Sequence, residues 1–252
     1  MGDELWGDEG LDEDLPAWAD LSSSAWQTRL DDPRSTDELI DLALRSSALD
    51  EGDGYMEALQ ILQIRGTREV LDAARALCAS PVVDERKLGV SILGRLGDTA
   101  PMLRVARRLR MSGEEKYREY ADELASSVPG AKDITPYPKE SLATLLPMLE
   151  TEQDIDTLRD VLCSIAEYGD YHPSIIPRIA EMRTHPCPEV RFTVTTRLAI
   201  HMDHPVACRT LAELANDEDD TVRDLAREWA SMRRALDREA AENGLSQDVG
   251  EE

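Results

Sequence analysis

A repeat of about 32 residues constrains the fold of this chain more than any other feature of its sequence. When residues 172–194 are laid over residues 204–226, the His-Pro pair at 172–173 coincides with the pair at 204–205, and Val190-Arg191 coincides with Val222-Arg223. Self-similarity at a short, fixed period is typical of stacked arrays, in which each unit buries its apolar side only against its neighbours.

Each repeating unit is predicted to be a pair of helices. Apolar residues recur at helical spacing and no segment alternates like a strand; the clearest helical stripe is Val222, Leu225, Ala226, Trp229 and Met232. An arginine recurs near the start of each second helix, at Arg86, Arg118, Arg159, Arg191 and Arg223. The widest gap in that series contains VPGAKDITPYPKE, whose prolines and glycine indicate an inserted loop. With one further hairpin at 36–47 and 55–65, the array has about six pairs.

Glycines mark the expected helix ends. Gly66, Gly97 and Gly169 each fall just beyond a predicted second helix, where a left-handed terminal residue favours glycine.

Three segments carry a resemblance to a known family. They are SPVVDERKLGVSILGRLGD at 80–98, HPCPEVRFTVTTRLAI at 185–200 and DEDDTVRDLAREWASM at 217–232. Each resembles the second half of a HEAT repeat, and the resemblance extends over roughly residues 36–236, with looser fits at 99–127 and 137–168. It implies an all-α fold, a right-handed α-solenoid of about six HEAT-like (armadillo-type) hairpins.

The resemblance also implies a structural ladder between neighbouring repeats. In the family, an arginine after valine and an acid in the turn of the repeat form its rungs. The counterparts here are Arg191 and Arg223, with Asp217 or Asp219 as turn acids. Pro186 and Pro188 stand where the repeat of Arg191 would have its acids, which puts that rung in question.

The charge and the cysteines favour a cytoplasmic protein. The net charge is -24, with 52 acidic and 28 basic residues, which argues against non-specific binding to nucleic acid or membranes. No apolar run suits a membrane helix, and the acidic start lacks the order of a signal peptide. The four cysteines, widely spaced and without a C-x-x-C motif, are expected to be free thiols: Cys78, Cys163, Cys187 and Cys208. The overall composition favours a bacterial source.

Two disordered tails are expected to flank the solenoid of residues 21–240. Residues 1–20 are acidic, and residues 241–252 are polar. In the first tail, Trp6 and Trp18 interleave with acids, as in a segment that docks in a groove and orders on binding, so we take them as candidate partner-binding residues. A plain disordered tail is the simpler interpretation.

A basic stripe at residues 101–111 is the second candidate for partner binding. PMLRVARRLRM has no acid, and its arginines are Arg104, Arg107, Arg108 and Arg110. Such a stripe suits an acidic partner or a phosphate. The simpler alternative is that these arginines pair with surplus acids on neighbouring helices.

Catalytic and metal chemistry are poorly supported. The four histidines form no His-Glu pair, which HEAT-like di-iron hydroxylases require. His201, His204 and Cys208, with His172, form a conceivable zinc set, but repeat register alone explains the His-Pro pairs. No acid stands isolated in an apolar run, as a raised pKa requires, and no nucleotide-binding or hydrolase motif is present. We therefore expect no catalytic residue, metal or cofactor.

The predicted function is a non-enzymatic protein–protein interaction scaffold or adaptor, with the second helices lining a concave surface. One alternative is a HEAT-like enzyme of the alkylpurine DNA glycosylase or pigment lyase type. Another is a regulatory module whose acidic tail masks its own surface. Another protein is the expected partner, nucleic acid is unlikely, no membrane is expected, and the oligomeric state stays open.

Overall fold

The computed structural model describes residues 31–49, 52–96, 137–169, 172–202 and 204–247, with side chains up to residue 233. By its internal contacts the chain divides into two compact units, residues 1–35 with 98–133 and residues 36–97 with 134–252. Every helix of the described residues belongs to the second unit, and the fold and site below are those of this unit.

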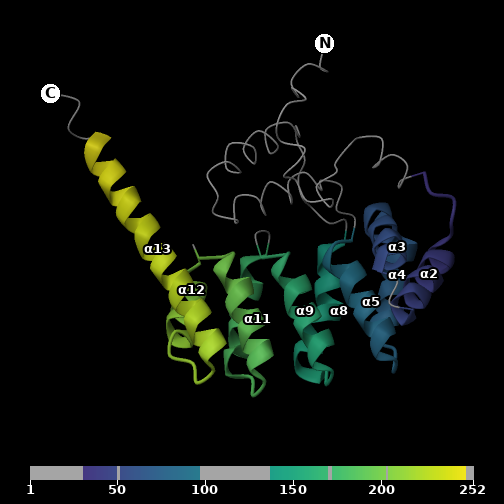
Figure 1. Ribbon diagram of the computed structural model, residues 1–252. Coiled ribbons are helices and arrows are strands. Elements are labelled where there is room, and N and C mark those ends of the chain that lie inside the picture. The colour runs from purple at the N-terminus through teal and green to yellow at the C-terminus, as the bar shows by residue number, and fades with distance from the viewer. Residues whose placement is uncertain (1–30, 50–51, 97–136, 170–171, 203, 248–252) are drawn as a thin grey trace, which may run out of the picture. The chain divides into compact units, whose positions relative to one another are not determined.

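The described part of the chain is all helical, as predicted, and its helices form consecutive pairs (Figure 1). In chain order these are α2 (Thr36–Ala48) with α3 (Gly52–Arg65), α4 (Arg68–Cys78) with α5 (Val83–Gly94), α8 (Pro138–Thr151) with α9 (Ile155–Ala166), a broken helix with α11 (Pro188–Ala199), and α12 (Pro205–Leu214) with α13 (Asp220–Gln247). The broken helix consists of η2 (Pro173–Ile175), α10 (Ile176–Glu181) and η3 (Met182–Thr184).

The pairs stack through their second helices. α5 packs against α9, α9 against α11, and α11 against α13, and Figure 1 shows these helices side by side. One continuous apolar core runs between the layers, and its fully buried residues include Leu88, Val161, Val194 and Val222. Because each pair buries its apolar side against the next, the stack is the solenoid arrangement that the repeat predicts.

The stack passes directly from α5 to α9, although 60 residues lie between the end of α5 at Gly94 and the start of α9 at Ile155. The described residues contain five helix pairs, and the further pair predicted at 99–127, with Arg118, lies outside them. Because α5 and α9 contact each other, the stack of described helices continues from one to the other.

Of the predicted glycine caps, Gly66 is confirmed, with a φ of 51°. Gly97 lies outside the described residues. The prediction for Gly169 is wrong, because Gly66 is the only glycine with a positive φ in the part of the chain that the structure describes. Position 169 instead requires glycine because there is no room for a side chain: a Cβ there would lie 2.3 Å from Cε1 of the buried His201.

Side chains from each later repeat bond to the carbonyl groups at the end of the preceding second helix. Tyr168 donates its hydroxyl to Leu93 O (2.5 Å), His201 donates Nε2–H to Ala166 O (3.2 Å), and Arg233 donates Nη1–H to Met202 O (2.6 Å). The three donors occupy one register position, fourteen residues after Asp154, Cys187 and Asp219, which precede their helices. These bonds give a donor from the next repeat to carbonyls at or just beyond a helix end, where the helix's own N–H partners run out.

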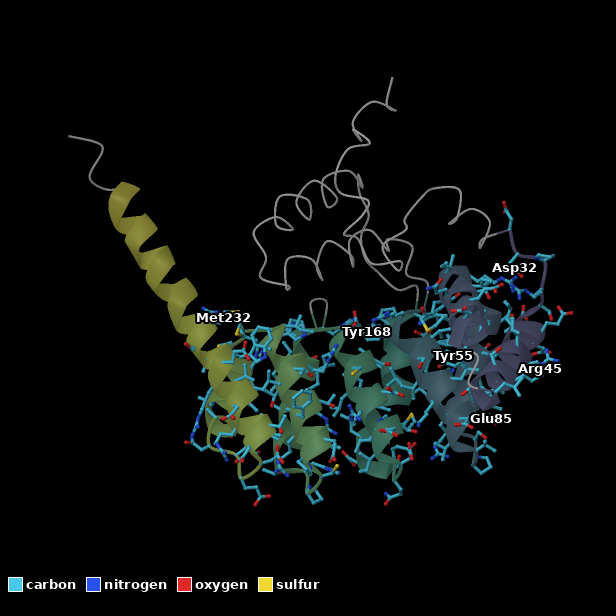
Figure 2. The ribbon with its side chains drawn as sticks, in the orientation of Figure 1. Asp32, Arg45, Tyr55, Glu85, Tyr168 and Met232 are labelled. Carbon is cyan, nitrogen blue, oxygen red and sulfur yellow. The ribbon has the colours of Figure 1, made fainter. Side chains whose placement is uncertain are left out.

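We expect Tyr168→Phe to lower the free energy of unfolding by about 1–2 kcal/mol, because Leu93 O loses its donor in a buried place. Figure 2 labels Tyr168 in the row of helices. Tyr137→Phe is the matched control, since the Tyr137 ring stacks on the Arg68 guanidinium at 5.8 Å and a phenyl ring keeps that contact. Urea denaturation of both variants measures the difference, and equal stability would contradict the assignment.

Candidate functional site

Near their starts, the second helices are joined by two partly buried ion pairs in the same register. Arg86 on α5 donates Nε–H and Nη2–H to the carboxylate of Glu152 at 2.7 and 2.9 Å, and Arg191 on α11 does the same to Asp217 at 2.9 and 2.8 Å. Each arginine lies four residues after the residue that precedes its helix, and each acid lies two residues before the corresponding residue of the following second helix. The ladder implied by the family resemblance is therefore present.

Each arginine of the ladder also holds its own turn. Nη1 of Arg191 donates to the carbonyls of His185 and Pro186, and Nη1 of Arg86 donates to those of Ser80 and Pro81. The Arg86 guanidinium keeps the pKa of Glu152 below its usual value, and Arg191 does the same for Asp217. The carboxylates are thus charged at neutral pH and fixed in place, which is a structural role.

The rung between α9 and α11 is missing. Arg159 lies near the start of α9, as predicted, but one residue beyond the ladder position, which the buried Leu158 takes. Arg159 instead bonds to the Thr193 hydroxyl at 3.2 Å and pairs with Asp156 at 3.3 Å on the surface. The acid position of the following repeat holds His185, whose Nδ1 accepts from Cys187 N. Both halves of this rung are therefore absent.

Arg223 occupies the ladder position of α13, after which the described residues contain no further pair. Its Nη1 holds the turn carbonyls of Asp217 and Glu218 and its Nη2 pairs with Asp220 of its own helix, so the rung predicted for Arg223 is not formed within the described residues.

The same register defines an exposed surface, which we call the second-helix face. It consists of the residues two, five, nine and thirteen positions after the residue that precedes each second helix, and none of them is buried. They are Asp84, Lys87, Ser91 and Arg95 on α5, Asp156, Arg159, Cys163 and Glu167 on α9, Glu189, Phe192, Thr196 and Ile200 on α11, and Thr221, Asp224, Glu228 and Met232 on α13. Because these helices are neighbours, the four columns form one continuous surface.

The chemistry of the second-helix face changes along the stack. On the α5 side it is ionic: Lys87 lies 3.8 Å from Asp154 and from Asp156, and Arg95 lies 3.5 Å from Glu167. On α11 and α13 the acids Glu189, Asp224 and Glu228 remain, but apolar or uncharged side chains stand between them: Phe192, Thr196, Ile200, Thr221 and Met232. Met232, labelled in Figure 2, keeps 40% of its surface exposed. Large apolar side chains held at a surface beside ion pairs are typical of protein-binding sites.

Two titratable groups of α9 have raised pKa values without suggesting catalysis. Burial raises the pKa of the Cys163 thiol, so this thiol is protonated at neutral pH and is a poor nucleophile. Burial also raises the pKa of Asp160, an acid that we did not expect from the sequence. The available signal was the apolar run VLCSIA immediately after it. A raised pKa on one carboxyl beside a protonated thiol provides no acid–base pair for a reaction.

The side chains considered above as a zinc set make hydrogen bonds with structural roles. His201 Nε2 bonds to Ala166 O, His204 Nδ1 accepts from Val206 N at the start of α12, and the Cys208 thiol donates to Met202 O at 2.8 Å. Across residues 31–233, as far as they are described, no three His, Cys, Asp or Glu side chains are placed to hold a metal ion. All four cysteines are free thiols, as expected.

The partner-binding residues predicted from sequence lie outside the described residues. These are Arg104, Arg107, Arg108 and Arg110 of the basic stripe, and Trp6 and Trp18 of the acidic tail. Helix α13 extends to Gln247, into the segment 241–252 that we treat as a tail, and disorder of that segment stays a prediction. None of the helices that the structure describes is both long and apolar enough to cross a membrane.

A comparison with known families supports the repeat assignment. The model of the HEAT-repeat family matches residues 142–230, from the first turns of α8 to the middle of α13. The match covers the three helix pairs at the C-terminal end of the stack and confirms the resemblance predicted from sequence. Among curated proteins, none matches the chain significantly.

Proposed function

Because residues 142–230 belong to the HEAT-repeat family, we propose that this chain is a non-enzymatic protein–protein interaction scaffold whose partner docks on the second-helix face. HEAT repeats commonly serve as protein-interaction scaffolds and are generally not enzymes. A family alone does not fix a function, so the proposal depends on the surface itself.

One observation carries the proposal: two large apolar side chains of the second-helix face, Ile200 and Met232, belong neither to the apolar core nor to the residues packed against it. Ile200 and Met232 stand at positions where the other columns have Arg95 and Glu167. Apolar groups at exposed register positions gain free energy when a partner covers them, and charged residues around them exclude competing partners.

We expect the double variant Ile200→Glu/Met232→Glu to weaken partner binding at least about tenfold, because it places two charges where an apolar contact would be desolvated. The measurement is quantitative affinity purification from the source cell with the full chain as bait. Leu49→Glu/Val82→Glu is the matched control, since both residues are exposed, at 67% and 49%, and neither belongs to the second-helix face. Recovery of the same partners with all three chains would rule out the second-helix face as the docking site.

A further inference from the structure

One arginine beside the second-helix face has no partner within the described residues. Arg197 on α11 makes no hydrogen bond and no ion pair there, although the chain has 52 acidic residues. Its Nε is buried and unsatisfied. The two terminal nitrogens are not buried in this way, so they remain open to an incoming acceptor. An unsatisfied donor of this kind needs an explanation, because buried polar groups are nearly always bonded.

The position of Arg197 follows from the repeat register. Arg197 lies ten residues after Cys187, and the corresponding residue of α9 is Ser164, which bonds to Val90 O of α5 at 3.2 Å and fills the space beside Gly94. This register position therefore faces the preceding second helix. For Arg197 the preceding helix is α9, and the charge of Arg197 acts on the Cys163 thiol, whose pKa is raised by burial and lowered by this arginine.

Three acids of the second-helix face are engaged elsewhere. Glu167 pairs with Arg95 on the α5 side, and Glu189 accepts a hydrogen bond from the Cys187 thiol. Asp156 is shared between Lys87 and Arg159. The array thus supplies a carboxylate to neighbouring cations but leaves the Arg197 guanidinium without one.

The contact between α11 and α13, the next one along the stack, also contains an unsatisfied donor. Trp229 lies ten residues after Asp219, so it occupies on α13 the position that Arg197 occupies on α11, and its indole Nε1 is also buried and unsatisfied. Arginine and tryptophan side chains donate hydrogen bonds and accept none. The exposed column of α11, with Thr196 and Ile200, is therefore flanked by two unsatisfied donors.

We infer that the second-helix face recognises an acidic, apolar peptide segment of its protein partner, which sets a carboxylate on Arg197 and an apolar side chain beside Ile200. This inference rests on the proposed function. A carboxylate can take two parallel hydrogen bonds from a guanidinium, which is the strongest neutral-pH pairing that this surface offers. The apolar contact then contributes affinity, and the carboxylate fixes which segment binds and in which register.

The test is a selection of random 12-residue peptides displayed against the full chain, followed by fluorescence-polarisation titration of one selected peptide. We expect Asp or Glu next to Leu, Ile, Phe or Trp in the selected peptides. Arg197→Met should weaken binding of the titrated peptide at least tenfold. Replacing the acid of the peptide by its amide should weaken binding to the wild-type chain by as much, but should change binding to the Arg197→Met chain little. Arg209→Met is the matched control, because Arg209 is an exposed arginine on α12 that also has no partner in the described residues. Circular dichroism checks that both variants fold.

The outcomes separate the inference from the function beneath it. Peptides that are lost on Ile200→Glu/Met232→Glu but show no acidic preference, or that bind Arg197→Met unchanged, overturn the inference and leave the proposed function standing. Peptides that ignore Ile200→Glu/Met232→Glu remove the proposed function itself. A chain without residues 1–20 that binds the peptide more tightly than the full chain would identify the occupant as the chain's own acidic segment and overturn the assignment to a partner.

Discussion

Replacing Arg191 with methionine is expected to lower the free energy of unfolding by about 3–5 kcal/mol, the cost of breaking a buried ion pair from one side. Arg191 and Asp217 are both only 7% exposed at their side chains, so the variant leaves a charged carboxylate in a place that water hardly reaches. It also removes the donor to the carbonyls of His185 and Pro186, so the turn before α11 loses its clamp.

Arg159→Met is the matched control for this prediction. By sequence the two arginines are equivalent, since both follow the repeat, but Arg159 is 40% exposed and pairs only with the surface residue Asp156 and the Thr193 hydroxyl. An exposed pair contributes about 0–1 kcal/mol, so this variant should be close to wild type. Urea denaturation gives both values. Similar losses for the two variants would mean that the register described for the ladder is incorrect.

The pH dependence gives a second readout of the same pair. The folded chain holds the Asp217 pKa below its value in the unfolded chain, so the stabilisation is complete at neutral pH and is lost as the pH falls below about 4. In the Arg191→Met chain the Asp217 carboxylate has lost its cation, so protonation of Asp217 removes the unpaired charge and stabilises the variant. The gap between variant and wild type should therefore narrow in acid. Arg191→Met/Asp217→Asn should regain much of the loss at neutral pH, because no unpaired charge is left.

The repeat predicted the architecture well because it records packing. The stripe through Val222 and Trp229 and the register of Arg191 with Arg223 follow from the need of every pair to bury one side against the next. The spacing of the arginines alone does not give the ladder register. Counting from the start of each helix places Leu158 rather than Arg159 at the ladder position, and the start of α9 is set by the Asp154 cap, which accepts hydrogen bonds from Thr157 N and from the Thr157 hydroxyl.

The candidate site was harder to predict for a physical reason. The second-helix face is defined by which side of each helix stays exposed, and this depends on where four helices begin relative to one another. Charge clusters attract attention in a sequence, as at Arg104–Arg110, but an arginine such as Arg197 is notable only because its neighbours bond elsewhere. That information lies in the pairing of Glu167 with Arg95, which are far apart in the chain.

Gly89→Ala is the second variant expected to have a large effect, a loss of about 2 kcal/mol or more in the free energy of unfolding. A Cβ at Gly89 would lie 2.7 Å from Ala74 O and 2.8 Å from Cys78 N, both backbone atoms of α4, so neither neighbour can rotate away. Overpacking of this kind costs about 1–3 kcal/mol and occasionally more, and the better helix propensity of alanine returns only about 1 kcal/mol. The crossing of α4 and α5 must therefore open.

Gly54→Ala provides the comparison that isolates the backbone contact. Its Cβ would meet the hydroxyl of Ser46, a side chain that can turn aside, so the gain in helix propensity should leave this variant near wild type or slightly more stable. Adding Cys78→Ala to Gly89→Ala removes the thiol at 2.9 Å but not the two backbone atoms, and it should give no rescue. Since α5 carries Lys87 and Ser91, opening this crossing would also shift the first column of the second-helix face against α9. Thermal denaturation of the four chains tests the argument, and a Gly89→Ala chain as stable as wild type would show that α4 and α5 are not held at this separation.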